Sequence, residues 1–221
     1  MRLYILYGFT FAVAFLLALY LTPLMRKAAL QFGIIDKPDG KLKNHHEPVA
    51  YLGGLAIYIS FLVSLALILS FDQEMLGILL AGTIIVVLGL IDDFGVLSPG
   101  VKLCGQSIAV LVLIRSGIYI KLGFIPWYVS FPLSYLWLIG ITNAFNIIDV
   151  MDGLSAGVAF VCLLAIFVVG VLNDSITIAF MAASLGGCLL GFLRFNFEPA
   201  KIYMGDTGSM FIGMMLGALT M

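Results

Sequence analysis

Apolar residues occur along this chain in long runs separated by short polar or glycine-rich stretches. The runs cover approximately residues 3–25, 52–71, 76–91, 102–118, 127–148, 156–172, 175–193 and 207–221. A helix needs ~20 apolar residues to cross the hydrocarbon core of a membrane, so the third and eighth runs must use flanking residues. Backbone groups in lipid must be satisfied internally, and the period-2 alternation of a β-barrel is missing. The pattern therefore predicts an all-α polytopic membrane helix bundle with about eight transmembrane helices.

The composition agrees with a membrane protein. Of the 221 residues, 62% are hydrophobic and 10% are charged, whereas a soluble domain is about 45–50% apolar and about 25% charged. Lysine and arginine total 11 against 12 acidic residues, so no nucleic-acid-binding surface is expected. The first run exceeds the ~7–15 apolar residues of a signal peptide and is interpreted as a retained span. We expect residues 1–221 to form a single integral membrane domain.

The basic residues are distributed unevenly between the two sides of the predicted bundle. The odd-numbered loops hold eight of the 11, namely Arg26, Lys27, Lys37, Lys41, Lys43, Lys102, Arg194 and Lys201. The positive-inside rule places these loops in the cytoplasm and the N-terminus outside. The same side holds nine of the 12 acidic residues: Asp36, Asp39, Glu47, Asp92, Asp93, Asp149, Asp152, Glu198 and Asp206. Acidic residues contribute little to topology, so their concentration there indicates a functional site.

Two adjacent aspartates, Asp92 and Asp93, end the third run in "LIDDFGVLSPGVKL". The helix dipole disfavours anions at a helix C-terminus, and the two carboxylates repel one another unless a cation relieves them. Such oxygen ligands suit Mg²⁺, which uses one or two carboxylates plus substrate phosphates. Lys102 follows nine residues later and is interpreted either as a point charge for phosphate or as an interfacial lysine. A solvated helix end is the alternative for the aspartates.

A second polar cluster, "NAFNIIDVMDGLSAG", follows the fifth run. Asn146, Asp149 and Asp152 recur at every third position and are expected on one side of a helix end. The alternative is a cluster of hydrogen bonds between helices. Gly153 allows a sharp turn or the close approach of a ligand.

The third cluster, "YMGDTGSM", precedes the last run. Asp206, Thr207 and Ser209 are candidate helix N-cap residues, and backbone amides at a helix N-terminus also bind phosphate. Tyr203 offers a flat face for a base. Taken alone, His45 in the basic first loop is more typical of a surface residue than of a ligand.

Taken in order, "DKPDGKLKNHHEPVAYLGG", "LIDDFGVLSPGVKL", "NAFNIIDVMDGLSAG" and "YMGDTGS" resemble the polyprenyl-phosphate N-acetylhexosamine-1-phosphate transferase family over essentially the whole chain. The resemblance implies transfer of a sugar 1-phosphate from a UDP-sugar to a polyprenyl phosphate such as undecaprenyl phosphate, with release of UMP. It also implies Mg²⁺, or Mn²⁺ in its place, and a plasma-membrane enzyme with its active site facing the cytoplasm. The product would start cell-envelope polysaccharide synthesis, and a homodimer is one expected state.

The same resemblance implies a role for each candidate residue. Asp92 is the expected base for the lipid phosphate, with Asp93 beside it, and Lys102 is expected to neutralise the pyrophosphate. The expected metal ligands are Asp206 and Asn146. The expected substrate-binding residues are Asp149, Asp152 and Gly153 around the nucleoside, Tyr203 against uracil, and His45. The first-loop histidine favours GlcNAc-1-phosphate, and a muramoyl-pentapeptide donor is the alternative.

Two departures and one competing function accompany this resemblance. Ala50 stands where many relatives carry proline, and Gly100 where a basic residue is frequent. The sequence ends inside the eighth run, so the C-terminal spans of relatives are expected to be missing. An ion- or proton-coupled transporter is the competing function, because carboxylates in membranes often mark ion pathways. A transporter predicts carboxylates near the bilayer midplane, whereas a transferase predicts them at the boundary.

Overall fold

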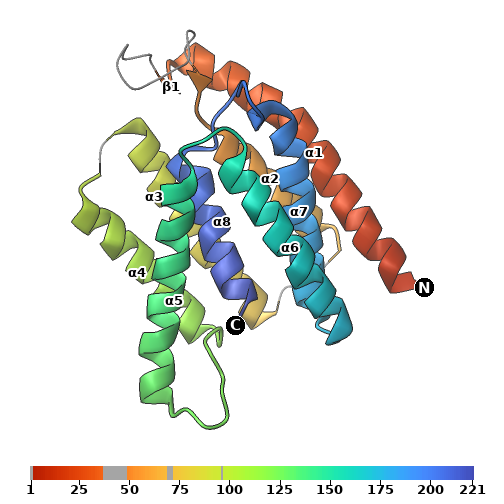
Figure 1. Ribbon diagram of the computed structural model, residues 1–221, viewed down its shortest axis with the longest axis vertical. Helices are drawn as coiled ribbons and strands as arrows, with labels where there is room; N and C mark the ends of the chain where they lie inside the picture. The colour runs from red at the N-terminus through yellow and green to blue at the C-terminus, as the bar shows by residue number, and fades with distance from the viewer. Residues whose placement is uncertain (1, 37–48, 69–71, 96) are drawn as a thin grey trace.

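The computed structural model describes residues 2–36, 49–68, 72–95 and 97–221, and within these ranges the chain is a bundle of helices (Figure 1). The helices are α1 Arg2–Phe32, α2 Gly53–Ala66, α3 Gln73–Phe94, α4 Pro99–Arg115, α5 Trp127–Ile148, α6 Leu154–Leu172, α7 Ile176–Asn196 and α8 Gly205–Leu219. Each predicted apolar run is therefore largely helical, and the all-α class is confirmed. Two short strands, β1 Ile35–Asp36 and β2 Val49–Ala50, pair in antiparallel fashion.

Length and apolar composition separate the helices into two groups. Five are long and apolar enough to cross a membrane: α1, α3, α5, α6 and α7. The other three are shorter, with 14 residues in α2, 17 in α4 and 15 in α8. The chain is therefore a multi-pass membrane protein, but the expected number of about eight spans is not confirmed.

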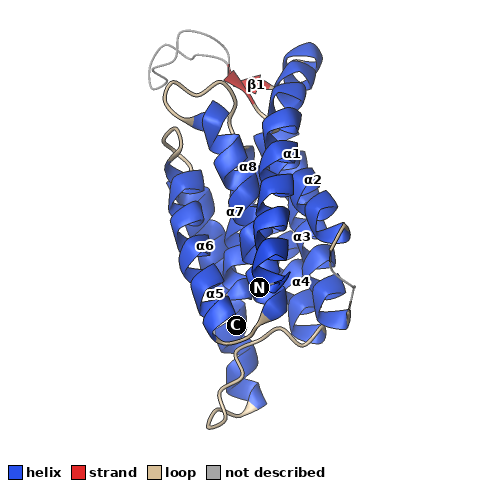
Figure 2. Cartoon of the chain, turned by 90° about the vertical axis from the view of Figure 1, so that its right-hand side faces the viewer, coloured by secondary structure: helices blue, strands red, loops and turns tan. Residues whose placement is uncertain are grey.

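Helices α7 and α8 form the centre of the bundle (Figures 1 and 2). In the most apolar part of α7, 78% of residues are buried, against 22% in α5. Every residue of α8 except Asp206 is buried. Helix α1 packs on α7, while α3 and α5 pack on α8. The one accessible side chain of α8 is thus the predicted metal ligand.

Glycines allow these central helices to approach their neighbours closely, as small residues commonly do between membrane helices. A Cβ at Gly191 of α7 would lie 2.7 Å from the Phe15 carbonyl oxygen of α1. A Cβ at Gly213 of α8 would lie 2.7 Å from the Thr142 Cα of α5. No real Cβ has such room, so α1 and α5 pack directly on the backbones of α7 and α8.

One end of the bundle collects the functional candidates. Helices α1, α3, α5 and α7 finish there and α2, α4, α6 and α8 begin there, and we call it the site end. The chain termini lie toward the opposite end (Figure 1). The β1–β2 pair lies at the site end, and Ala50 accepts a hydrogen bond of 2.8 Å from the Tyr203 amide. This pair was not predicted, because two-residue strands are too short to show alternation.

Candidate functional site

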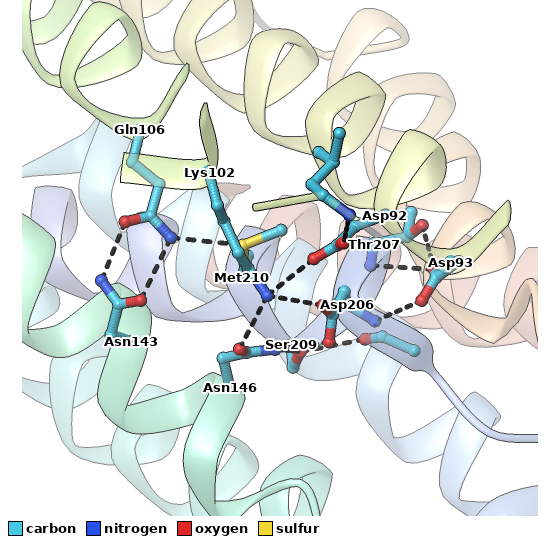
Figure 3. Close-up of polar contacts among 12 residues, drawn as sticks. Asp92, Asp93, Lys102, Gln106, Asn143, Asn146, Asp206, Thr207, Ser209 and Met210 are labelled. Atoms are coloured by element: carbon cyan, nitrogen blue, oxygen red, sulfur yellow. Dashed lines mark hydrogen bonds and ion pairs between the residues drawn. The ribbon is translucent and has the colours of Figure 1, made fainter. Parts of the chain in front are cut away.

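Lys102 is the central residue of the site (Figure 3). Its Nζ lies 2.9 Å from Asp92 Oδ2 and 2.5 Å from Asp206 Oδ2. It also donates to Asn146 Oδ1 at 3.1 Å. Asp92 is in the last turn of α3 and Lys102 in the first turn of α4, so each charge occupies the helix end that the dipole disfavours. The ion pair compensates for both positions.

Asn146 connects the other members of this group from the end of α5. Its Nδ2 donates to Asp206 Oδ1 at 2.7 Å and to Ser209 Oγ at 3.0 Å. Asp92 Oδ1 also accepts from the Leu97 amide at 2.9 Å. Side chains from α3, α4, α5 and α8, far apart in the sequence, therefore converge as predicted.

Asp93 points away from Lys102 and binds the start of α8 instead. Its Oδ1 accepts from the Asp206 amide at 2.8 Å. Its Oδ2 accepts from the Thr207 amide at 3.1 Å and from Thr207 Oγ1 at 2.5 Å. These bonds satisfy orphan donors of the first helical turn, and the anion lies at the favourable end of the helix dipole. The structure thus gives Asp93 a positioning role next to Asp206.

The prediction that Asp206, Thr207 or Ser209 caps α8 with its own side chain is wrong. The N-cap residue is Met204, which makes no side-chain cap bond, and α8 begins at Gly205. The cap comes from α3, because Asp93 reaches the free amides across the helix contact. No local sequence signal reports a cap that comes from another helix.

The prediction of one polar ridge through Asn146, Asp149 and Asp152 is also wrong. Helix α5 ends at Ile148, and Asp149 already has non-helical backbone angles. Beyond this turn, Asp152 Oδ2 accepts from the Ala200 amide at 2.7 Å. Asp152 therefore holds the connection between α7 and α8.

Gly153 makes the turn that the sequence predicts. Its φ is +71°, in the left-handed region, and α6 begins at the next residue. Its amide donates at 3.1 Å to Asn196 Oδ1, whose Nδ2 donates at 3.0 Å to the Ile202 carbonyl. The buried Asn196, which sequence reasoning missed, thus joins the α5–α6 turn to the segment leading to Tyr203 and Asp206.

Asp149 lies beyond the end of α5, outside the membrane-spanning segment, and its pKa is strongly perturbed. Burial, followed by the negative charges of Asp206, Asp93 and Asp152, raises this pKa from its ordinary value to about 7. Neutralising charges nearby would lower it again. The pKa of Asp149 therefore reflects its burial first and the negative charge of the site second.

This raised pKa predicts a specific pH dependence of stability. The folded state favours protonated Asp149. Its contribution to the free energy of unfolding is therefore complete below the unfolded-state pKa of ~3.9 and is lost as pH rises through about 7. Without divalent cations, thermal unfolding from about pH 5.5 to about pH 8.5 should show a smaller loss of Tm in Asp149→Asn than in the parent. Parallel Tm profiles for the two proteins would show that Asp149 does not titrate in this range.

One helical turn further along α4 from Lys102, the side-chain amides of Gln106 and Asn143 exchange two hydrogen bonds. Gln106 Nε2 donates to Asn143 Oδ1 at 3.2 Å, and Asn143 Nδ2 donates to Gln106 Oε1 at 2.8 Å. Gln106 is buried and was not singled out from the sequence, although an amide inside an apolar run is the signal that could have found it. The pair joins α4 to α5 directly beneath Lys102 and Asn146.

A double-mutant cycle on Gln106 and Asn143 should show coupling of about 1 kcal/mol, because interhelical hydrogen bonds in membranes have this size. Gln106→Leu leaves the Asn143 amide without its partner, and Asn143→Leu does the converse. In mixed detergent micelles, the double variant should therefore unfold with nearly the same free energy as the less stable of the two single variants. Losses that simply add would mean that the two amides do not interact.

Of the remaining predicted substrate-binding residues, Tyr203 makes its described contacts with the start of α2 and the segment before it. The Tyr203 ring is tilted against Tyr51, with ring centroids 6.0 Å apart. The Tyr203 carbonyl accepts from the Gly53 amide at 3.0 Å, which fixes it to the start of α2. His45 lies outside the described residues. The uracil and donor-sugar roles of these two residues stay predictions.

The donor set at Lys102 suits a hard divalent cation. Within the described ranges, no three histidine, cysteine, aspartate or glutamate side chains form a metal cluster. However, two carboxylate oxygens and one amide oxygen converge on a cation, the Lys102 ammonium. Mg²⁺ commonly uses one or two carboxylates, with phosphate and water completing its shell. Asp92 and Asp206 with Asn146 therefore fit this ion.

The fold and the site together define the class of protein. It is a multi-pass helical membrane protein in which carboxylates bound to a lysine form a polar site at one end of the bundle. Residues 75–221 match the family model described as glycosyl transferase family 4. This match covers most of the chain and includes the α3, α4, α5 and α8 residues of the site. The chain belongs to this family.

Individual relatives fall into two groups by name. A probable undecaprenyl-phosphate N-acetylglucosaminyl 1-phosphate transferase of Bacillus subtilis is 34% identical over 96% of this chain and 61% of its own length. A decaprenyl-phosphate N-acetylglucosaminephosphotransferase of Mycolicibacterium smegmatis is 36% identical over 96% of this chain and 58% of its own length. A phospho-N-acetylmuramoyl-pentapeptide-transferase of Heliobacterium modesticaldum is 33% identical, with 95% and 71% covered. The chain thus spans about three fifths of the first two relatives.

Proposed function

We propose that this chain carries the active site of a phosphotransferase that moves a sugar 1-phosphate from a UDP-sugar to a polyprenyl phosphate, with release of UMP. The observation that carries the proposal is the convergence of Asp92, Lys102, Asn146 and Asp206 from four helices at one end of the bundle. Phosphoryl transfer depends mainly on positioning and on charge neutralisation, which such a group supplies. The reaction would start the synthesis of a cell-envelope polysaccharide.

In the proposed reaction, an oxygen of the lipid phosphate forms a bond to the sugar-linked phosphorus of the donor. The bond from this phosphorus to the oxygen of UMP breaks, and UMP leaves with that electron pair. Where the attacking phosphate carries a proton, Asp92 takes it on Oδ1, because Oδ2 is the oxygen that faces the cation position. Lys102 neutralises phosphate oxygens as a mobile point charge. Asp93 holds the start of α8 so that Asp206 stays at the site.

Mg²⁺, or Mn²⁺ in its place, is the proposed cofactor, and Asp206 with Asn146 and Asp92 would hold it. When bound, the ion supplies Lewis acidity toward phosphate oxygens. The Asp206 side chain is 33% exposed, compared with 11% for Asp92. Asp206 is therefore the carboxylate more accessible to an incoming ion or diphosphate. Asp149, Asp152 and Gly153 would line the nucleoside side of the site.

The position of the site supports a reaction between a membrane lipid and a water-borne nucleotide. Asp92 lies in the last turn of α3 and Asp206 in the first turn of α8. Transport would favour carboxylates at the middle of the spans, where they mark ion pathways. These positions support an active site at a membrane boundary, and we propose that it is the cytoplasmic boundary of the plasma membrane, which the distribution of basic residues favours. A homodimer stays a prediction.

GlcNAc-1-phosphate is the proposed group transferred, because several relatives are named for N-acetylglucosamine. A muramoyl-pentapeptide donor is the second candidate, because other relatives carry that name. His45, which the sequence associates with the GlcNAc branch, would belong to the donor-binding loop.

UMP release tests the proposal. Purified protein in detergent is incubated with undecaprenyl phosphate and either UDP-GlcNAc or the UDP-muramoyl-pentapeptide, with Mg²⁺ or with a chelator. We expect UMP and a lipid-linked sugar diphosphate only with lipid and divalent cation, more readily from UDP-GlcNAc, and none from Asp92→Asn. UMP yields that do not depend on lipid, metal or Asp92 would refute the assignment.

A further inference from the structure

The Lys102 ammonium fills a complete oxygen cage. Its three N–H donors face Asp206 Oδ2 at 2.5 Å, Asp92 Oδ2 at 2.9 Å and Asn146 Oδ1 at 3.1 Å. The three acceptors come from three helices, α8, α3 and α5 (Figure 3). An ammonium has three donors and no acceptor, so Lys102 has no donor left for a substrate phosphate in this arrangement.

These three oxygens are also the ones that a divalent ion would use. Mg²⁺ requires ligand oxygens at about 2.0–2.1 Å. An ion bound to Asp206 and Asp92 would occupy nearly the same point as the Lys102 nitrogen. Two cations so close together repel strongly, and each shared oxygen would have to bind both the ion and the ammonium. The ammonium and the metal ion therefore exclude each other from this position.

The surroundings allow the lysine side chain to leave while the helices stay in place. Lys102 is in the first turn of α4, and its side chain is 18% exposed. One turn deeper, the pair of Gln106 and Asn143 holds α4 to α5. Lysine has a flexible four-carbon stem, so a change of its rotamer can carry the ammonium from the cage toward solvent, to which the side chain is already partly exposed.

We infer that Lys102 is an internal counter-cation, which keeps the metal-free site assembled and is displaced when a divalent cation binds. This inference rests on the proposed function and deepens it, because only the displaced lysine is free to bind the donor diphosphate. Metal and diphosphate binding then become coupled, since the phosphates give the displaced ammonium a new partner. By linkage, each ligand raises the affinity of the site for the other.

Chemical labelling of the unmodified protein tests this inference without a variant. Lysines are acetylated briefly in detergent, with and without Mg²⁺, and quantified by mass spectrometry. We expect Mg²⁺ to raise the labelling rate of Lys102 about tenfold, because an ammonium released from two carboxylates becomes available to the reagent. Lys201, at the site end, and Lys121, at the other end, should label equally in both conditions.

Binding of Mn²⁺, measured by its EPR signal, provides the second arm. Lys102→Met removes the competing cation, so the Mn²⁺ dissociation constant should fall about tenfold, equivalent to ~1.4 kcal/mol. The matched control is Lys201→Met, an exposed lysine of the same end, which should leave Mn²⁺ affinity unchanged. A lysine that merely stabilises the fold would give weaker Mn²⁺ binding on replacement.

The outcomes separate this inference from the proposed function. If Mn²⁺ binds in an Asp206-dependent manner while Lys102 labelling stays constant or falls, the displacement is refuted and the metal-dependent transferase stands. Weaker Mn²⁺ binding by Lys102→Met refutes the displacement in the same way. If the parent binds no Mn²⁺ at all, both the displacement and the proposed metal site are overturned.

Discussion

Replacing Asp206 with asparagine is expected to lower the transfer rate by ~10²–10³ or more, the effect typical of removing one group that stabilises developing charge. Asp206 is the only residue of α8 that is not buried, and its two oxygens bind Lys102 at 2.5 Å and Asn146 at 2.7 Å. The asparagine variant keeps the shape of the side chain but removes its charge. The measurement is UMP release from UDP-GlcNAc with undecaprenyl phosphate at saturating Mg²⁺.

Asp174→Asn is the matched control for this prediction. Asp174 is exposed at the opposite end of the bundle, and its left-handed φ of 54° is one that asparagine also adopts readily. The control should keep the activity and the Tm of the parent. An Asp206→Asn protein that folds normally and retains more than about a tenth of the activity would remove Asp206 from the reaction.

Gly89→Ala is expected to have the second-largest effect on the site, although Gly89 has no side chain that could contact a ligand. It lies on α3 one turn before Asp93, and a Cβ there would lie 2.5 Å from the Thr207 Cα. The extra methyl group would separate α3 from the start of α8, and Asp93 could no longer reach the amides of Asp206 and Thr207. We expect the free energy of unfolding to fall by about 1–3 kcal/mol, as in other overpacked cores. The Mn²⁺ affinity should also fall by about tenfold or more.

Gly157→Ala provides the comparison. Gly157 lies inside α6, and a Cβ added there would meet no atom within 4 Å. Alanine is the better helix former by about 0.5–1 kcal/mol, so this variant should be as stable as the parent or slightly more stable. If both variants unfold at the same temperature and bind Mn²⁺ equally, then α3 and α8 are not held together in the way described here.

Much of the fold was predictable because a membrane protein shows its helices directly in its apolar runs. The run at 127–148 coincides with α5, and the run at 156–172 is extended by only two residues in α6. The number of spans was not predictable in the same way, because α2 and α4, with 14 and 17 residues, are helices too short to identify as crossings from composition alone.

The composition of the site was predictable to a useful extent, but its connections were not. A polar group at the edge of an apolar run is a recognisable signal, and the four residues that carry it here converge in the structure, namely Asp92, Lys102, Asn146 and Asp206. The positions of these residues in the sequence do not indicate that Asp93 caps α8. That bond joins residues more than a hundred positions apart, and only the packing of α3 on α8 creates it.

The α5–α6 turn shows why helical periodicity misled at one point. The three-residue spacing of Asn146, Asp149 and Asp152 fits a helix, but Gly153 and the hydrogen bond from Ala200 to Asp152 favour a turn. Long-range contacts therefore override the local pattern. Gln106 and Asn196 were missed for a related reason, since the sequence gives no indication of the partner of a single amide.

The most direct test of the central claim, that groups from α3 and α8 hold one divalent ion together, is an EPR titration of Mn²⁺ into the purified protein. The parent should bind a single ion that Mg²⁺ displaces. Asp92→Asn and Asp206→Asn should each weaken Mn²⁺ binding by about tenfold or more, while Asp174→Asn should bind like the parent. Undiminished Mn²⁺ binding by a protein that carries both the Asp92 and the Asp206 replacements would contradict the account.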